Sequence, residues 1–175
     1  MAKRPQSWAQ SINLYNMSDR VYGFEPVYNK DSKLLILGSF PSVKSRKIDF
    51  YYGNRQNRFW KTVCSFFGED IPETREDKIA FLLRRNIALW DIVTECEIVG
   101  SKDSTIKNFK IADLEKVLQN SQISFIILNG STAFEIFQKN YGDIDISYER
   151  LPSTSPANPT FKSEVWFDVL RRIFG

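Results

Sequence analysis

Short, nearly continuous apolar runs alternate along the chain with longer segments in which apolar residues recur at helical spacing. The apolar runs predict buried strands at 33–38, 86–93 and 123–128, and a weaker strand at 144–150. The helically spaced segments predict helices at 57–67, from about Pro72 to Leu83, and at 112–118, 132–141 and 161–174. Strands that alternate with helices predict an α/β fold: a three-layer sandwich whose central, mostly parallel sheet of four or five strands is flanked by helices.

Polar residues add local detail to this pattern. Thr74 and Asp77 have the spacing of a capping box at the start of one helix. Ser131 is placed to cap the helix that follows it. Glu95 to Asn108 is polar and without a periodic pattern, so we expect a long irregular connection there.

Composition narrows the class of protein. The chain has 175 residues, of which 42% are hydrophobic and 26% charged, as in an ordinary globular protein. It contains no histidine and only two cysteines, Cys64 and Cys96. Ser-His-Asp and Cys-His catalysis, histidine-ligated metals and four-cysteine clusters are therefore excluded. We expect no metal and no cofactor, and two reduced, buried thiols.

The polar, aperiodic stretch at 1–20 predicts an N-terminal extension, and 21–175 is expected to form a single domain. The chain shows neither the apolar core of a signal peptide nor a run of 18 apolar residues. We therefore expect a soluble, cytoplasmic protein that acts away from membranes as a monomer. The net charge of +3 permits a basic face without requiring one.

Three segments rich in small polar residues follow predicted strands. They are 38–42, 129–132 and 151–158. Ligands of open α/β sheets bind beyond the carboxyl ends of the strands, so these segments predict the site. Gly38 would let the backbone approach a ligand, or it is simply the residue of a turn. Neither GxxxxGK[ST] nor GxGxxG is present, which argues against ordinary nucleotide cofactors.

Aromatic and cationic residues are interleaved between 38 and 60. Phe50, Tyr51 and Tyr52 are either core residues or a platform on which a base stacks. The cations of this stretch are expected to face phosphates, and they are Lys44, Arg46, Lys47, Arg55 and Arg58. Asn57 is either an N-cap or a group that holds a water molecule or a substrate.

Six stretches of the chain together resemble the uracil-DNA glycosylase superfamily, most closely its hypoxanthine-DNA (deoxyinosine) glycosylase branch. They are LILGSFPS (35–42), YYGNRQNRFWKTV (51–63), IALWDIV (87–93), GSKDSTI (100–106), LNG (128–130) and LPSTSPAN (151–158). The resemblance implies hydrolysis of the bond between a base and its sugar in DNA that carries a deaminated base, hypoxanthine or uracil, after the base has been flipped out.

The resemblance also implies roles for particular residues. Related enzymes have an asparagine in the first motif where this chain has Phe40, so Asn57 is the candidate that positions the attacking water. Tyr52 matches the ring that stacks on the flipped base. Substrate contacts are implied for Gly38, Ser39, Phe40, Tyr52 and Asn129. Contacts to the duplex are implied for Ser153, Ser155, Pro156, Ala157 and Asn158.

Two other hypotheses fit the same residues. The replacement of the first-motif asparagine by Phe40 is compatible with a protein that binds damaged or single-stranded nucleic acid without hydrolysing it. Alternatively, Asp91 or Asp103 could be the catalytic carboxylate of a small-molecule enzyme, although a cap or surface role is the simpler interpretation of each. A pocket too narrow for a base would favour this third hypothesis.

Overall fold

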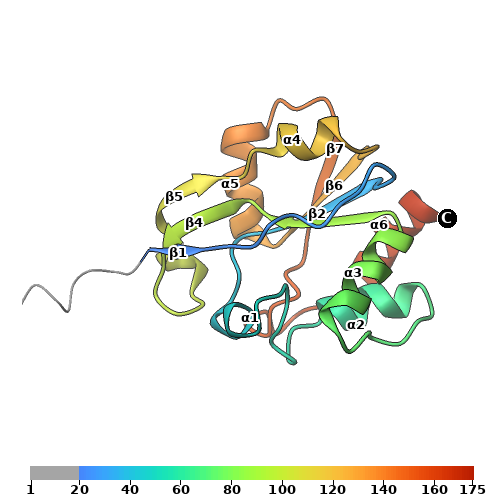
Figure 1. Cartoon of the computed structure of the whole chain (residues 1–175), viewed down its shortest axis with the longest axis horizontal. Helices are drawn as coiled ribbons and strands as arrows, with labels where there is room; N and C mark the ends of the chain where they lie inside the picture. Colours follow the sequence, from blue (N-terminus) through green and yellow to red (C-terminus); the bar gives the residue numbers. More distant parts are fainter. Residues whose placement is uncertain (1–19) are drawn as a thin grey trace, which may run out of the picture.

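The computed structural model describes residues 20–175, and a parallel sheet runs through its centre (Figure 1). Its strands are β2 (Leu34–Gly38), β3 (Ile87–Asp91), β6 (Phe125–Asn129) and β7 (Ser147–Leu151). They are hydrogen-bonded in the order β3-β2-β6-β7, and every pair is parallel. All residues of β2 and β3 are buried, as expected for strands covered on both faces.

Helices cover both faces of this sheet. α2 (Phe59–Phe66), α3 (Arg75–Arg84) and α6 (Ser163–Phe174) lie on one side, and α4 (Leu114–Gln119) and α5 (Ser131–Tyr141) lie on the other (Figure 1). This arrangement follows from the strand order, because right-handed crossovers that move in opposite directions from β2 put their helices on opposite faces. The predicted three-layer α/β sandwich is confirmed, with four strands.

A second, antiparallel sheet was not predicted. It consists of β1 (Val21–Tyr22), β4 (Val93–Glu97) and β5 (Lys107–Ile111), with the short 3₁₀ helix η1 (Asp103–Thr105) between β4 and β5. The irregular connection predicted over 95–108 is therefore wrong in part. Four of the five residues of β5 are exposed, so its sequence KNFKI carries no inward-facing apolar alternation to reveal the strand.

Local predictions at helix ends had mixed outcomes. Thr74 accepts a hydrogen bond from the backbone N–H of Asp77, which confirms that cap. The predicted cap by Ser131 is wrong, because α5 begins at Ser131 itself and its N-cap is Gly130, whose φ of 98° favours glycine. α1 (Val43–Ile48) was missed, since only Ser45 of this helix is buried and no apolar face marks it.

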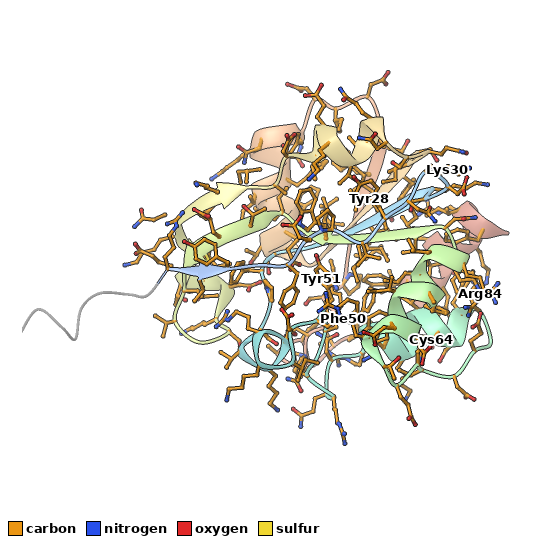
Figure 2. The ribbon with its side chains drawn as sticks, in the orientation of Figure 1. Tyr28, Lys30, Phe50, Tyr51, Cys64 and Arg84 are labelled. Carbon is orange, nitrogen blue, oxygen red and sulfur yellow. The ribbon has the colours of Figure 1, made fainter. Side chains whose placement is uncertain are left out.

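The remaining expectations concern the ends and the thiols. The extension predicted at 1–20 lies outside the described residues except for Arg20, whose guanidinium forms an ion pair with Glu95 at 2.8 Å. Cys64 and Cys96 are both free and buried, as predicted, and Cys64 is labelled in Figure 2. Among residues 20–175, no helix has the length and apolar character needed to cross a membrane.

Candidate active site

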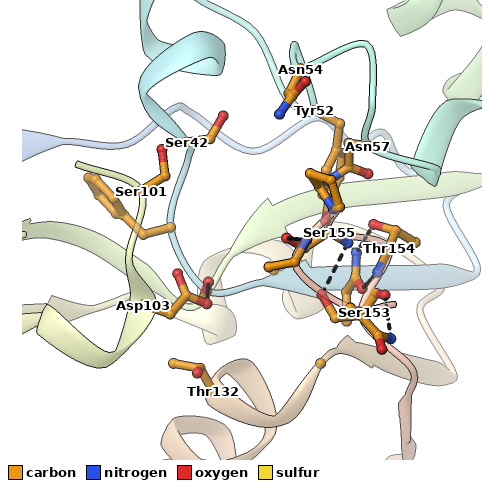
Figure 3. Close-up of a pocket in the computed structure, with 18 of the residues that line it drawn as sticks. Ser42, Tyr52, Asn54, Asn57, Ser101, Asp103, Thr132, Ser153, Thr154 and Ser155 are labelled. Atoms are coloured by element: carbon orange, nitrogen blue, oxygen red, sulfur yellow. Dashed lines mark hydrogen bonds between the residues drawn. The ribbon is translucent and has the colours of Figure 1, made fainter. Parts of the chain in front are cut away.

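The carboxyl ends of the parallel strands open into one cleft with a volume of about 1070 Å³. The register explains this convergence, because Gly38 pairs with Asp91 and Asn129 pairs with Leu151 at the ends of their strands. The structure brings all of the predicted site residues to this cleft: Gly38, Ser39, Phe40, Tyr52, Asn57, Asn129, Ser153, Ser155, Pro156, Ala157 and Asn158. Asp103 and Ser101 lie on one side of the cleft, across from Tyr52, Asn57 and Ser155 (Figure 3).

Gly38 lies between two functional groups at the floor of the cleft. A Cβ at this position would be 2.4 Å from Oδ1 of Asp91 and 3.0 Å from the hydroxyl oxygen of Tyr52. No side chain fits there without displacing one of these groups. Gly38 therefore lets a carboxyl and a phenol approach the end of β2 from two sides.

The Tyr52 ring is half-buried and stacks on Phe59, with centroids 4.1 Å apart and planes 18° apart. Its backbone has a φ of 52°, an uncommon value for a bulky residue that often marks a functional site. Its hydroxyl accepts a hydrogen bond from the Asn129 side chain at 3.1 Å. Burial, and secondarily the nearby Asp91, holds the pKa of Tyr52 well above its ordinary value, so the phenol is neutral.

The two aromatic residues that precede Tyr52 belong to the core. Phe50 and Tyr51, labelled in Figure 2, are 4% and 2% exposed. The Tyr51 hydroxyl donates to the Glu25 carbonyl at 2.8 Å, and the Trp60 indole donates to the Tyr51 carbonyl at 3.1 Å. Phe50 and Tyr51 are therefore core residues, and the platform interpretation stays a prediction for the half-buried Tyr52.

Hydrogen bonds with β3–β4 and η1 hold the turn after β2. The Gly38 and Ser39 carbonyls accept hydrogen bonds from Ile92 and Val93 at 2.9 and 3.1 Å. The Ser39 hydroxyl donates to Asp103 at 2.6 Å. Within residues 20–175, the backbone N–H groups of Ser39 and Phe40 donate to no protein acceptor. These two amides remain available to a ligand.

Asn57 precedes the N-cap of α2, which is Arg58, so the interpretation of Asn57 as the N-cap is wrong. Its side-chain oxygen still accepts the backbone N–H of Phe59, the first residue of α2, at 2.9 Å. An amide oxygen has a second lone pair, and the side chain also lines the cleft. The hydrogen bond from Phe59 fixes the orientation of the amide, which a group that positions a water molecule requires.

Asn129 joins three parts of the site. Its side-chain nitrogen donates to the Tyr52 hydroxyl and, at 3.0 Å, to the hydroxyl of the buried Thr154, while its oxygen accepts the Thr154 backbone N–H at 3.0 Å (Figure 3). The Asn129 amide thus fixes the tyrosine ring relative to the 151–158 loop. Thr154 was not among the predicted site residues, although its place inside the Ser-Thr-Ser motif marked the segment.

Hydrogen bonds within the 151–158 loop tie its residues together. The Asn158 side chain donates to the Ser153 carbonyl at 3.0 Å, and the Ser153 hydroxyl accepts the Ser155 N–H at 3.2 Å. Pro156 and Ala157 are exposed at the tip of this loop. The loop therefore presents an internally hydrogen-bonded edge beside the cleft.

Two of the cations predicted to face phosphates have structural roles instead. The Arg58 guanidinium donates to the carbonyls of Ser155 and Asn158, and Arg46 donates to the Pro41 carbonyl at 2.9 Å. Backbone carbonyls at loop turns need donors, and the forked guanidinium supplies several. These two arginines hold the loops that form the cleft.

The other three cations of this stretch, Lys44, Lys47 and Arg55, are exposed. None of them forms an ion pair within the described part of the chain. They lie on α1 and on the turn that leads to Asn57, and both lysines line the cleft. These side chains are free to contact phosphates.

Two carboxyls give the cleft an unusual electrostatic character. Asp91 is 5% exposed, and its Oδ2 is buried without a hydrogen-bond partner. Burial, followed by the charge of Asp103, raises the pKa of Asp91 to about 8. Burial also raises the pKa of Asp103, and the hydrogen bond from Ser39 opposes that shift. The sequence offered Asp91 as a catalytic carboxylate or, more simply, as a cap or surface residue; the simpler interpretation is wrong, because the side chain is buried and its Oδ2 has no partner.

The described residues contain no group of three or more His, Cys, Asp or Glu side chains that could hold a metal ion. The lining of the cleft supplies amides, hydroxyls, a phenol, two carboxyls and nearby cations. This set can bind a flat polar ring, hold a water molecule and stabilise a developing negative charge.

The fold and the cleft have counterparts among known proteins. The family model described as "Uracil DNA glycosylase superfamily" matches residues 25–170. The chain belongs to this superfamily, as the six stretches in the sequence indicated.

Relatives within the superfamily cover most of the chain. A hypoxanthine DNA glycosylase of Methanosarcina acetivorans is 32% identical over 154 residues, which are 85% of this chain and 97% of that protein. A hypoxanthine DNA glycosylase of Methanosarcina barkeri is 30% identical over 115 residues, 65% of this chain and 73% of that protein. A solution NMR structure from Methanosarcina acetivorans, described as a candidate uracil DNA glycosylase, superposes with a TM-score of 0.79 at 31% identity and covers 90% of this chain and 100% of that one.

Proposed function

We propose that the protein is a monofunctional DNA glycosylase that hydrolyses the N-glycosidic bond of a deaminated base, hypoxanthine or uracil, in base excision repair. Membership of the superfamily and the names of the relatives support this proposal. The observation that carries it is the half-buried Tyr52 ring, fixed in one cleft with the free amides of Ser39 and Phe40.

Base flipping sets the first energetic requirement. Extruding a nucleotide from a duplex costs roughly a few kcal/mol, and less for a mispaired base. Stacking on an aromatic ring returns roughly 1–3 kcal/mol per base. The Tyr52 ring is already oriented by Phe59 and Asn129, so little conformational freedom is lost when a base stacks on it.

Bond cleavage builds negative charge on the departing base and positive character on the sugar. The backbone N–H groups of Ser39 and Phe40 stabilise the base as it leaves, in the manner of an oxyanion hole. Asn57 orients the attacking water through the free lone pair of its oxygen. An amide is a weak general base, so most of the rate enhancement comes from leaving-group stabilisation and positioning.

Contacts to the rest of the DNA come from two edges of the cleft. Ser153 to Asn158 form the internally hydrogen-bonded edge, whose exposed Pro156 and Ala157 press against the duplex. Lys44, Lys47 and Arg55 contact phosphates and supply salt-dependent affinity that does not depend on sequence. All of these contacts lie around one cleft of one chain, so we expect a monomer that acts on DNA in the cytoplasm.

A protein that binds damaged nucleic acid without hydrolysis is the alternative, since Phe40 replaces the first-motif asparagine. The cleft is too roomy to favour the third hypothesis, which required a pocket narrower than a base. Single- and double-stranded oligonucleotides containing deoxyinosine or deoxyuridine distinguish the first two. The proposal predicts abasic sites, detected as strand breaks after alkali treatment, whereas retention of the oligonucleotide without abasic sites would support the binding protein.

A further inference from the structure

Asp91 has no structural reason to carry a carboxyl. Asp91 is the last residue of β3, and the other four residues of that strand are apolar. It pairs with Gly38, the last residue of β2. Its Oδ2 is fully enclosed and has no hydrogen-bond partner among the described residues. Leaving a buried polar atom unpaired costs roughly 1–3 kcal/mol, so a carboxyl kept there needs a function or a missing partner.

The surroundings keep this carboxyl in its neutral form. The titratable groups that face it are Asp103 on η1, whose charge acts on Asp91, and Tyr51 and Tyr52 on the loop before α2, whose own pKa values Asp91 raises; none of them is a cation. Burial and the like charge of Asp103 raise the pKa of Asp91 to about 8. At neutral pH the group is a carboxylic acid, which has one O–H donor, whereas an ionised carboxylate only accepts.

A donor at the floor of the cleft matches what deamination does to a base. Adenine carries an amino group, a donor, where hypoxanthine carries a carbonyl oxygen, an acceptor. Cytosine and uracil differ in the same way. Because Oδ2 is enclosed, only Oδ1 can reach a base in the cleft. When Oδ1 carries the proton, it pairs with the carbonyl oxygen of a deaminated base and opposes the amino group of the normal base donor to donor. Sites built around one hydrogen bond of this kind discriminate strongly, because the wrong partner leaves a buried group unpaired.

We infer that Asp91 acts as a neutral carboxylic acid that donates a hydrogen bond to the carbonyl oxygen of the flipped base, and thereby distinguishes a deaminated base from its amino precursor. This inference rests on the proposed glycosylase function. It gives the cleft a second contact to the departing base, in addition to the Ser39 and Phe40 amides. The position of Oδ1 beside Gly38 and the Tyr52 hydroxyl places this contact next to the stacking ring.

The test compares the whole chain with its Asp91→Asn and Asp91→Ala variants in single-turnover excision of hypoxanthine between pH 6.5 and about 9.5. Asparagine keeps a donor of nearly the same shape but does not ionise, and alanine removes the donor. At pH 7 we expect alanine to slow excision roughly tenfold, the effect of one lost hydrogen bond, and asparagine to restore most of that loss. The unmodified protein should lose activity as the pH rises through about 8, when the carboxyl becomes an acceptor.

The pH profile separates this role from a merely structural one. The chain has no histidine, so few other side chains titrate in this range, and the Asp91→Asn variant should show no fall near pH 8. An unmodified protein whose rate is flat from pH 7 to 9, or an asparagine variant as slow as the alanine variant, would overturn the inference while leaving the glycosylase function intact. An unmodified protein without excision would contradict the function itself.

A second measurement covers the case in which a variant does not fold. Carbon-13 labelling of the aspartates of the unmodified protein allows NMR to follow the Asp91 carboxyl directly, with the Asp91→Asn spectrum used for assignment. We expect this carboxyl to titrate several pH units above the exposed aspartates. A carboxyl that is already ionised at pH 6 would rule out the donor role whatever the activity.

Discussion

The Tyr52 ring lies against the Phe59 ring, with centroids 4.1 Å apart and planes 18° apart. One face of the tyrosine is therefore covered by a residue of α2, and only the opposite face can receive a base. Phe59 is completely buried, so it supports the half-buried Tyr52 ring from the side of the core. This packing fixes the orientation of Tyr52, a loop residue that lines the cleft.

Substitution of Tyr52 tests the stacking contact. Tyr52→Phe keeps the ring and loses the hydrogen bond from Asn129, so we expect less than about a tenfold decrease in excision. Tyr52→Ala removes the ring and should lower the affinity for flipped-base DNA by about 1–3 kcal/mol. Binding to an oligonucleotide with a single deoxyinosine, compared with the same sequence without it, measures the difference. If both variants lost the same amount of binding affinity, the hydroxyl and not the ring of Tyr52 would be the group that binds the base.

The exposed lysines beside the cleft should determine the salt dependence of DNA binding. Each phosphate contact adds roughly 0.9 to the slope of log affinity against log salt concentration. We expect the double variant Lys44→Ala, Lys47→Ala to reduce that slope by about 2, in titrations from 50 to 200 mM salt. Lys116→Ala, on the exposed surface of α4 away from the cleft, is the matched control and should leave the slope unchanged.

Gly38 should not tolerate a side chain. A methyl group there would lie 2.4 Å from Asp91 Oδ1, so Gly38→Ala should destabilise the fold by about 1–3 kcal/mol and greatly reduce excision. Gly68→Ala is the control, since Gly68 has a φ of 67° but no atom within 4 Å of the new methyl group. It should cost about 1–2 kcal/mol in denaturant unfolding and leave excision unaffected. Full excision by Gly38→Ala would show that the contact with Asp91 is unimportant.

The buried Asp91 should make the fold less stable as the pH rises. Its pKa is about 8 in the folded protein and about 3.9 in an unfolded chain, so the folded state binds more protons between these values. The free energy of unfolding should therefore fall between pH 5 and 8 by up to about 1.4 kcal/mol per pH unit. Urea unfolding at several pH values checks this, and Asp91→Asn should flatten the dependence. A stability that rises over this interval would contradict a neutral Asp91.

Much of the fold was predictable because its central strands are short, continuous apolar runs between helices with clear apolar faces. The segment 34–38, for example, is fully buried, and its run of four apolar residues predicts this burial. β4 and β5 escaped prediction because they pair near the surface, where the half-buried glutamates of β4 and the exposed lysines of β5 replace the apolar alternation. α1 escaped for the same reason, since its helix rests on polar contacts around Ser45.

The site was predictable as a set of segments, and less so as individual roles. The sequence shows that Asn129 and Tyr52 each lie beside a turn. It does not show that the Asn129 side chain donates a hydrogen bond to the Tyr52 hydroxyl. Arg58 and Lys44 are equivalent as charges in a sequence, and only the structure separates the arginine that holds loop carbonyls from the lysine that is free. The neutral state of Asp91 depends on burial by residues distant in the chain.

The most direct test of the account is the release of free base from duplex DNA containing one deoxyinosine, measured in single turnovers by chromatography for the unmodified protein and for Asn57→Ala. DNA binding is measured in parallel. Thr74→Ala is the control: like Asn57→Ala it removes a side-chain hydrogen bond to the backbone at the start of a helix, at a cost of about 1 kcal/mol, but it lies away from the cleft. We predict release of hypoxanthine by the unmodified protein and by Thr74→Ala, and a much larger loss of release than of binding for Asn57→Ala. Binding without release by the unmodified protein would contradict the glycosylase function, and undiminished release by Asn57→Ala would remove Asn57 from the mechanism.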